Sequence, residues 1–304
     1  MRDSLNRARA RARVTCTCTI LILMVATAAA DNVTVGLYAP TAPFPSTAAR
    51  VEFASKLGGE LGRALGGNGG GKVFARAGDF AAAVKSGEVT IALVDATYLA
   101  AVGGNFTVIA GAVRNGDTQH GWQLVARGAD KIAGLRGKRV LVPAVAGRET
   151  DFVVDVLFGG EVGRDFFAKI EASPDTASAL AALGLGKADA VVVPAGVELP
   201  AGTQVVLTLP VLSGPVLVVY GNASAQRRQQ LGAAAAEFRG DATVGSFRPV
   251  DAEAIHAITR RFAPVVKRGP LAVPSIRLLV GDLVAGRTLT IERTPPATFA
   301  AAPK

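Results

Sequence analysis

One pattern of apolar and polar positions occurs twice in the chain, at residues 79–94 and at residues 175–193. Each copy begins with an alanine-rich, helix-like stretch, stops at a glycine, and continues after a short polar step into a run of apolar residues. The glycine stops are Gly87 and Gly186. Each copy therefore predicts a capped helix followed by a buried strand. The repetition predicts two α/β lobes of similar construction with a cleft between them.

Strands and helices alternate along the rest of the chain, as they do in α/β proteins with mostly parallel sheets. The glycine-rich residues 66–71 are interpreted as a flexible turn between a helix and a strand. Further helices are predicted to begin at Ser46 or Thr47 and to cover residues 150–157, 224–238 and 251–262. Further strands are predicted at residues 33–38, 72–77, 106–113, 122–126, 140–143, 166–172, 205–210 and 216–220.

The order of these elements predicts a chain that starts one lobe, crosses to a second lobe and returns. Residues 31–121 are predicted to form the first part of lobe 1, and residues 122–208 are predicted to form lobe 2. Residues 209–262 then complete lobe 1, so that the strands which open and close lobe 2 are the two crossovers. Residues 263–304 are predicted to be a C-terminal extension that is partly irregular, because its end is rich in proline and alanine.

The first 30 residues have the pattern of an export signal. Five arginines stand among the first 13 residues, an apolar run follows at residues 20–26, and Ala28-Ala29-Ala30 offers a cleavage site. The apolar run is shorter than the roughly 20 residues that span a bilayer. We expect a cleavable Sec-type signal peptide and a periplasmic protein. An uncleaved anchor and an organellar transit peptide remain alternatives.

Composition narrows the function further. The net charge of +9 owes much to the N-terminal arginines, and no Lys/Arg run is interleaved with aromatic residues, so the chain is not expected to bind nucleic acid. Cys16 and Cys18 both precede the predicted cleavage site, which leaves no thiol nucleophile or thiolate metal site after it. His120 and His256 lie far apart in the sequence and predict no metal site. We expect no cofactor.

Five phrases, taken in order, resemble type II periplasmic solute-binding proteins, in the phosphate, phosphite and phosphonate branch of ABC importers. Their order and spacing carry the resemblance, because no single phrase is decisive. It extends from about residue 33 to residue 262. The phrases are Val33-Thr34-Val35-Gly36-Leu37, Gly87-Glu88-Val89-Thr90-Ile91-Ala92, Leu135-Arg136-Gly137-Lys138-Arg139-Val140, Gly186-Lys187-Ala188-Asp189-Ala190 and, more weakly, Phe247-Arg248-Pro249-Val250-Asp251.

The resemblance implies a two-lobed α/β fold of the periplasmic-binding-protein type II class. Each lobe would be a mixed, mostly parallel sheet flanked by helices, and two crossover strands would join the lobes. It also implies a monomeric binding protein that captures a small anion of the phosphate or phosphonate type and passes it to an ABC transporter permease in the inner membrane.

Ligands of open α/β sheets bind beyond the carboxyl ends of the strands, and three loops of this chain meet that condition. The third loop opens a helix, whose free N–H groups and positive dipole end favour an anion. Within it Arg148 offers a bidentate contact to a phosphoryl or carboxylate group, and Thr150 offers a hydroxyl. The predicted ligand-binding residues are Tyr38 and Thr41 in the first loop, Asp95, Thr97 and Tyr98 in the second, and Arg148, Glu149 and Thr150 in the third.

Structural roles compete with these ligand roles. Tyr98 matches an aromatic residue of the family, although a packed residue at a helix start has the same pattern. Arg148 can be a solvated helix-end charge, and Asp95 can cap the next turn. The family carries a Ser-Thr-Ser-Gly-like run at the third loop, where this chain has Ala146-Gly147-Arg148-Glu149-Thr150. Glu149 would repel an anion unless its side chain points away.

Two other functions remain open from the sequence. A ligand-sensing protein that serves a membrane receptor without a transporter would have the same pattern. An exported enzyme on the same fold is the other possibility, since a fold does not define an activity. The chain has no G-x-S-x-G, no H-E-x-x-H and no Cys-His pair, so we expect that it is not an enzyme.

Overall fold

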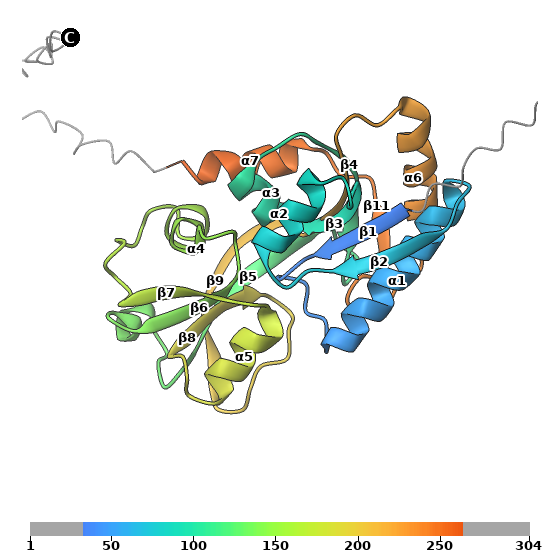
Figure 1. Cartoon of the computed structure of the whole chain (residues 1–304). Helices are drawn as coiled ribbons and strands as arrows, with labels where there is room; N and C mark the ends of the chain where they lie inside the picture. Colours follow the sequence, from blue (N-terminus) through green and yellow to red (C-terminus); the bar gives the residue numbers. More distant parts are fainter. Residues whose placement is uncertain (1–32, 264–304) are drawn as a thin grey trace, which may run out of the picture.

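A computed structural model describes residues 33–263 of the chain, which fold into two lobes that each contain a β-sheet and flanking helices (Figure 1). The predicted signal peptide lies outside the described residues, as does the predicted C-terminal extension apart from Ala263. None of the helices between residues 33 and 263 combines the length and the apolar character that are needed to cross a bilayer.

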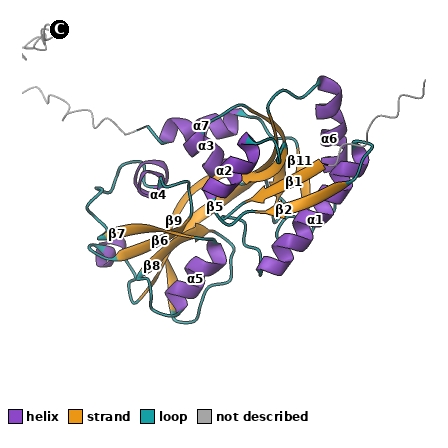
Figure 2. Cartoon of the chain, in the orientation of Figure 1, coloured by secondary structure: helices purple, strands orange, loops and turns teal. Residues whose placement is uncertain are grey.

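The first lobe contains a six-stranded sheet within the described residues, in the order β11-β4-β10-β3-β1-β2. Four of its strands run in one direction, and β10 and β11 run in the other. Helices α1 and α6 share a core on one face of the sheet, while α2 and α3 cover the other face (Figure 2). The strands are β1 (Val33–Tyr38), β2 (Gly69–Val73), β3 (Ile91–Asp95), β4 (Phe106–Val113), β10 (Pro215–Tyr220) and β11 (Ser246–Arg248), and the helices are α1 (Thr47–Ala64), α2 (Ala77–Lys85), α3 (Ala96–Val102), α6 (Ala225–Glu237) and α7 (Glu253–Arg261).

The second lobe contains a five-stranded sheet in the order β7-β6-β8-β5-β9, in which β5 alone runs against the other described strands. Helix α5 packs on one face, and α4 continues directly into the π-helical turn η2 on the other. The elements are β5 (Gln119–Arg127), η1 (Ile132–Leu135), β6 (Arg139–Pro143), α4 (Glu149–Asp151), η2 (Phe152–Leu157), β7 (Lys169–Ser173), α5 (Thr176–Gly184), β8 (Ala190–Pro194) and β9 (Thr203–Ser213).

The chain crosses between the lobes twice, and the two crossings lie side by side. It leaves the first sheet after β4, enters β5, and returns from β9 to β10, with Gln119 of β5 opposite Ser213 of β9. The backbone N–H of Gly214 donates to the carbonyl of Thr118 over 2.8 Å, which ties the crossings together. The predicted architecture of two mixed sheets flanked by helices and joined by two crossover strands is confirmed. The prediction that the sheets are mostly parallel is wrong, because four of the described strand pairs are parallel and five are antiparallel.

One hydrophobic core runs through both lobes. Tyr38 and Tyr98 of the first lobe belong to the same buried cluster as Trp122 and Phe152 of the second. The ring centroids of Trp122 and Phe152 are 5.0 Å apart, and the ring of Phe262, which follows α7, lies 6.2 Å from that of Phe152. Burying one such side chain contributes about 1.5–3 kcal/mol to stability. The two lobes are therefore packed together in a closed arrangement.

Both copies of the repeated pattern fold as a helix, a glycine stop and a buried strand. Gly87 and Gly186 adopt positive φ angles of 77° and 69°, the left-handed conformation that glycine tolerates best after a helix. Asp175 caps α5 by accepting the Ser178 N–H over 2.7 Å. The predicted start at Asp79 is wrong, because α2 begins at Ala77 and Asp79 lies in its first turn. There the carboxylate complements the helix dipole.

The interpretation of residues 66–71 as a flexible turn is wrong for residues 69–71, which belong to a strand. Residues 69–73 form strand β2, which pairs in parallel with β1, and residue 77 already belongs to α2. Helix α1 packs so closely on β2 that a Cβ on Gly58 would overlap the backbone of Gly70. The glycines of this strand are required by helix–strand contact and do not mark a flexible segment.

The strand predicted at residues 166–172 is shifted towards the C-terminus in the structure. It begins at Lys169, because Phe166 and Phe167 are buried in the preceding loop, where their rings meet edge to face at 4.9 Å. Buried apolar residues in a loop next to a strand have the same sequence pattern as the strand itself, so the sequence alone does not separate them. The other predicted strands and helices of residues 33–263 are confirmed within a few residues of their ends.

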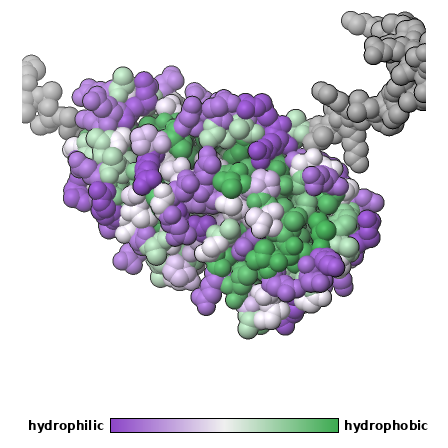
Figure 3. Space-filling model, turned by 180° about the vertical axis from the view of Figure 1, so that it is seen from behind, coloured by the Kyte–Doolittle hydropathy of each residue, from purple (hydrophilic) through white to green (hydrophobic). Residues whose placement is uncertain are grey.

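Strand β9 forms an edge of the second sheet. Val205, Leu207 and Val211 on this strand are large apolar residues that remain exposed. Seen from the side opposite to Figure 1, hydrophobic residues gather on the half of the molecule that the second lobe forms (Figure 3). Exposed apolar edges of this kind are unusual on proteins that make no contact with another chain.

Candidate ligand-binding site

The first two predicted loops are joined by a buried carboxylate. Asp95 ends β3, and its two oxygens accept the backbone N–H of Thr41 over 2.9 Å and the Thr41 hydroxyl over 2.6 Å. Both residues are buried. Burial raises the pKa of the Asp95 carboxyl to about 7, although the bonds from Thr41 and the charge of Arg50 act in the opposite direction. Asp95 therefore fixes the loop after β1 against the end of β3.

Tyr38 ends β1, and Thr97 and Tyr98 lie in the first turn of α3, so the predicted second loop is a helix from Ala96 onward. The ring of Tyr38 stacks on Phe80 at 5.4 Å and meets Tyr98 edge to face at 4.9 Å. Within residues 33–263, the buried hydroxyls of Tyr38 and Thr97 have no hydrogen-bond partner. A buried polar group that stays unpaired costs about 1–3 kcal/mol. These two hydroxyls are therefore suited to contact a ligand.

The third loop binds its own carboxylate. Ala146 and Gly147 have positive φ angles of 54° and 81°, and this turn directs backbone N–H groups to one point. Glu149 occupies that point, because its Oε1 accepts the N–H of Val145 over 2.8 Å and that of Gly147 over 3.1 Å. Two N–H groups of the turn before α4 therefore converge on one point, which a side chain of the same loop occupies, and the binding of an external anion there stays a prediction.

Glu149 also connects the third loop with the first. Burial is the main cause that raises the pKa of the Tyr38 hydroxyl, followed by the charges of Asp95 and Tyr98 and then that of Glu149. Tyr38 belongs to the first lobe and Glu149 to the second. The fold therefore brings predicted residues of all three loops into one region between the lobes.

Arg148 has a different environment from the one that was predicted. Its Nε donates to Asp151 over 3.0 Å, and its other nitrogens donate to the carbonyls of Ala101 and Phe262 over 3.4 and 3.3 Å. Its guanidinium also lies 4.5 Å from the centre of the Phe262 ring. Arg148 thus ties the second lobe to α3 and to the end of α7. Thr150 is half-buried in α4.

A second set of contacts joins the lobes at the loop that follows β1. The N–H of Thr176 donates to the carbonyl of Pro40 over 3.0 Å, and the Thr176 hydroxyl donates to the carbonyl of Thr41 over 3.1 Å. Arg50 of α1 forms an ion pair of 2.9 Å with Asp175, the residue that caps α5. Together with Arg148, these contacts hold the closed arrangement.

Sequence reasoning missed Arg50, Asp175 and Thr176 as residues of the interface between the lobes, and it missed Arg114 at the crossing. Arg114 is buried, with 7% of its surface exposed, and its Nη2 donates to the carbonyl of Ala195 over 2.8 Å. One signal was available, because Arg114 directly follows an apolar strand and precedes the break at Asn115 and Gly116. For the other three, no local pattern distinguishes them from ordinary helix ends.

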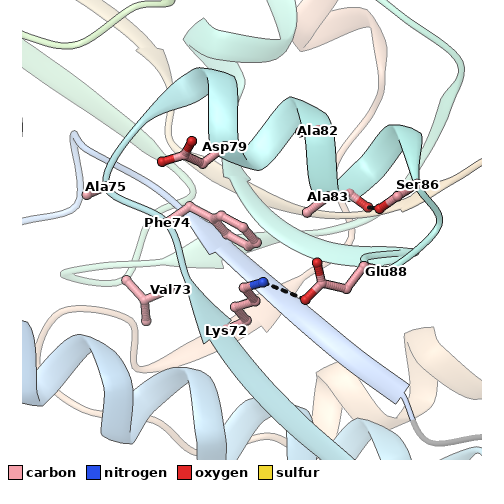
Figure 4. Close-up of a pocket in the computed structure, with 9 residues that line it drawn as sticks. All are labelled: Lys72, Val73, Phe74, Ala75, Asp79, Ala82, Ala83, Ser86 and Glu88. Atoms are coloured by element: carbon pink, nitrogen blue, oxygen red, sulfur yellow. Dashed lines mark hydrogen bonds and ion pairs between the residues drawn. The ribbon is translucent and has the colours of Figure 1, made fainter.

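A groove lies on the outer surface of the first lobe (Figure 4). It has a volume of about 500 Å³ and lies between β2 and α2, with the 2.5 Å ion pair of Lys72 and Glu88 across it. β2 is an edge strand, and none of the eight predicted residues lines this groove. It is therefore separate from the region between the lobes. Between residues 33 and 263, no three His, Cys, Asp or Glu side chains are grouped so that they could hold a metal ion.

Comparisons with known proteins identify the fold. No protein-family model matches the sequence, and no curated protein matches it by sequence. The chain is similar to a binding protein component of an ABC phosphonate transporter from Pseudomonas aeruginosa, at 12% identity over 75% of this chain and 84% of that one, with a TM-score of 0.60.

Two further solved structures agree with this comparison. PhnD1 from Prochlorococcus marinus, in complex with methylphosphonate, matches at 12% identity over 76% of this chain and 97% of its own, with a TM-score of 0.60. XAC2383 from Xanthomonas citri, bound to ATP, matches at 12% identity over 76% and 96%, with a TM-score of 0.57. At such identities the similarity establishes the fold alone. The chain therefore has the two-lobed α/β fold of type II periplasmic solute-binding proteins, as its sequence phrases predicted.

Proposed function

We propose that this protein is an exported solute-binding protein, which closes its two lobes around a small anionic solute and presents it to an ABC transporter permease. One observation carries the proposal. The hydroxyls of Tyr38 and Thr97 in the first lobe have no partner among the described residues, and the Tyr38 hydroxyl lies close enough to Glu149, which accepts the N–H groups of Val145 and Gly147 in the second lobe, for that charge to raise its pKa. The structural relatives named for methylphosphonate and ATP support an anion as the ligand class.

The solute has to compete with Glu149. The two N–H groups that would bind an anionic oxygen already donate to the Glu149 carboxylate. Hydrogen bonds to a charged acceptor contribute about 1.5–3 kcal/mol each, so the internal carboxylate is a substantial competitor. Binding therefore proceeds by exchange, in which the Glu149 side chain turns away and the solute takes over its donors. The charge of Glu149 lowers the affinity for any anion until that exchange occurs.

The contacts between the lobes determine what must break when the cleft opens. The bonds of Thr176 to the loop after β1, the Arg50–Asp175 ion pair and the bonds of Arg148 must all break when the lobes separate. The two crossings, tied by Gly214 and Thr118, form the hinge about which the lobes move. A solute that bridges the lobes adds its own contacts to the closed state and shifts the population towards it.

The proposal also includes a periplasmic location for the protein and a membrane permease as its partner. Residues 1–30 direct export and are removed, so that the mature chain is periplasmic. We propose separately that it works as a monomer. A permease in the inner membrane then recognises the closed form, in which both lobes present one continuous surface. The protein binds the solute and does not transform it.

Calorimetric titration tests the proposal. The full chain is titrated with phosphate, phosphite, methylphosphonate and small carboxylates, alongside the Glu149→Gln and Glu161→Gln variants. Glu161 is an exposed carboxylate of the same lobe, so its variant makes the same change of charge away from the loop. We expect binding of one solute per chain and at least a tenfold gain in affinity in Glu149→Gln only, because about 1.4 kcal/mol corresponds to a factor of ten. If none of the three proteins binds any of these anions, the proposal is wrong.

A further inference from the structure

A small, partly open cavity lies at the hinge, and none of Tyr38, Thr97 and Glu149 lines it, although Thr41 forms one of its walls. Its walls include Pro43 of the loop after β1, Pro215 at the start of β10 and Thr243 of the loop before β11, together with Arg114 and His120 of the first crossing. The space open to the centre of a water molecule is about 10 Å³. That space suits one small species, such as a water molecule or a monatomic ion.

The cavity is lined by a buried guanidinium that lacks a countercharge. Arg114 is 7% exposed, and only its Nη2 is engaged, with the carbonyl of Ala195. Its Nε and Nη1 are buried and have no hydrogen-bond partner in the part of the chain that the structure describes. Burial lowers the pKa of the Arg114 guanidinium, and no neighbouring carboxylate opposes this effect. A buried charge without a partner is strongly destabilising, so the fold needs another source of negative charge here.

The side chains around Arg114 do not supply that charge. Burial and the charge of Arg114 lower the pKa of His120 to about 4, so its imidazole is neutral at neutral pH and carries no negative charge. The nearest acidic residue of the crossing, Asp117, is exposed, and its carboxylate accepts the N–H of Gln119 over 3.0 Å. The carboxylates of Asp95 and Asp241 are both engaged, Asp95 with Thr41 and the exposed Asp241 with the backbone N–H groups of Thr243 and Val244. The cavity therefore keeps a net positive charge and two unpaired N–H donors.

We propose that the hinge cavity binds one halide ion, chloride under ordinary conditions, held by the charge of the Arg114 guanidinium and by one of its two unpaired N–H groups. A monatomic anion supplies the missing countercharge and accepts one of the two N–H groups, and it fits a space that excludes a polyatomic anion such as phosphate. Arg114 leaves the first sheet after β4 and donates to the second lobe at Ala195. The bound ion thus stabilises the residue that fastens the hinge. This site is independent of the solute site, whose donors are other residues.

Thermal unfolding of the full chain tests the halide site. Melting temperatures are measured in sodium chloride, sodium bromide and sodium gluconate at equal ionic strength, for the wild type, Arg114→Gln and Arg248→Gln. Arg248 is the matched control, because it is exposed and donates to the carbonyl of Gly116 in the same crossing over 2.9 Å. At a tenfold excess over the dissociation constant, we expect chloride and bromide to raise the melting temperature by about 3–6 °C relative to gluconate. The rise is expected in the wild type and in Arg248→Gln, and not in Arg114→Gln.

Crystals of the wild type grown in bromide keep the proposal testable if Arg114→Gln does not fold. An anomalous bromide peak in contact with the Arg114 guanidinium supports the site. Equal melting temperatures of the wild type in the three salts, or bromide peaks on the surface only, would overturn it and leave water as the occupant of the cavity. Neither outcome depends on whether the cleft binds a solute, so a failure here is distinct from a failure of the proposed function.

Discussion

Asp95 makes the pH dependence of stability a sharp test of the structure. The carboxyl is buried at the end of β3, and burial raises its pKa from 3.8 to about 7. Since each factor of ten in proton affinity is worth about 1.4 kcal/mol, the ionised form costs the folded state about 4 kcal/mol. The bonds from Thr41 oppose this cost and are already included in the balance, because they lower the same pKa.

The sign of the effect follows from proton binding. Below 3.8 the carboxyl is protonated in the folded and the unfolded chain, and its titration does not affect stability. Between 3.8 and about 7 the folded chain keeps a proton that the unfolded chain has released, so stability falls as the pH rises. Above about 7 both states are ionised and the loss is complete. Asp95→Asn cannot ionise, so its stability lacks this contribution at every pH.

Urea unfolding, followed by the fluorescence of the buried Trp122, measures the free energies of unfolding of the wild type and of Asp95→Asn. The stability of Asp95→Asn relative to the wild type should increase by about 4 kcal/mol from about pH 4 to about pH 8. At low pH the Asp95 carboxyl is neutral like the amide, so the variant should lack the advantage that it has at high pH. Asp79→Asn, at an exposed position of α2, is the control and should show a much smaller change. Parallel profiles for the wild type and Asp95→Asn would refute the reasoning.

Three further substitutions test the packing and the interface between the lobes. Gly58→Ala should lower the free energy of unfolding by about 1–3 kcal/mol, because the added Cβ would overlap the backbone of β2. Gly59→Ala is the control and should be neutral or stabilising, because its Cβ meets open space. Equal effects of the two substitutions in urea unfolding would contradict the close contact of α1 with β2. Phe152→Ala should cost about 3–5 kcal/mol in the same assay, and a cost below about 1 kcal/mol would show that the core shared by the lobes is not tightly packed. Thr176→Val removes a hydroxyl bond across the cleft and should increase the radius of gyration in small-angle X-ray scattering without solute, while an unchanged radius would show that this bond does not hold the lobes closed.

The sequence predicts the fold where local patterns and packing agree. The two copies of the repeated pattern, with glycine stops at Gly87 and Gly186, each fold as predicted, because a glycine after a helix followed by an apolar run indicates a helix end and a buried strand. The sequence does not indicate that Gly69 and Gly71 belong to a strand, because glycine is frequent both in flexible turns and where a helix packs closely on a strand. Only the position of α1 against β2 distinguishes these cases, and that position is a tertiary property.

The candidate site is predictable in position and less so in detail. The strand-end rule predicts that Tyr38, Asp95 and Glu149 lie near one another, and the charges of Asp95 and Glu149 do act on the Tyr38 hydroxyl, whereas their role in binding a ligand stays a prediction. It does not indicate that Glu149 turns back to its own loop, or that Arg148 donates to carbonyls of the other lobe. Those contacts depend on side-chain direction and on residues distant in sequence. Arg114 illustrates the same limit, because its burial arises from the two crossings meeting.

Native mass spectrometry tests most directly the central claim that the cleft holds a small solute. The full chain, purified without denaturation, is measured before and after addition of phosphate, methylphosphonate or acetate, and again under denaturing conditions. We expect one small molecule per native chain, either retained through purification or acquired from one of the added anions, and its loss on denaturation. A native chain that carries no small molecule before or after these additions would contradict the claim.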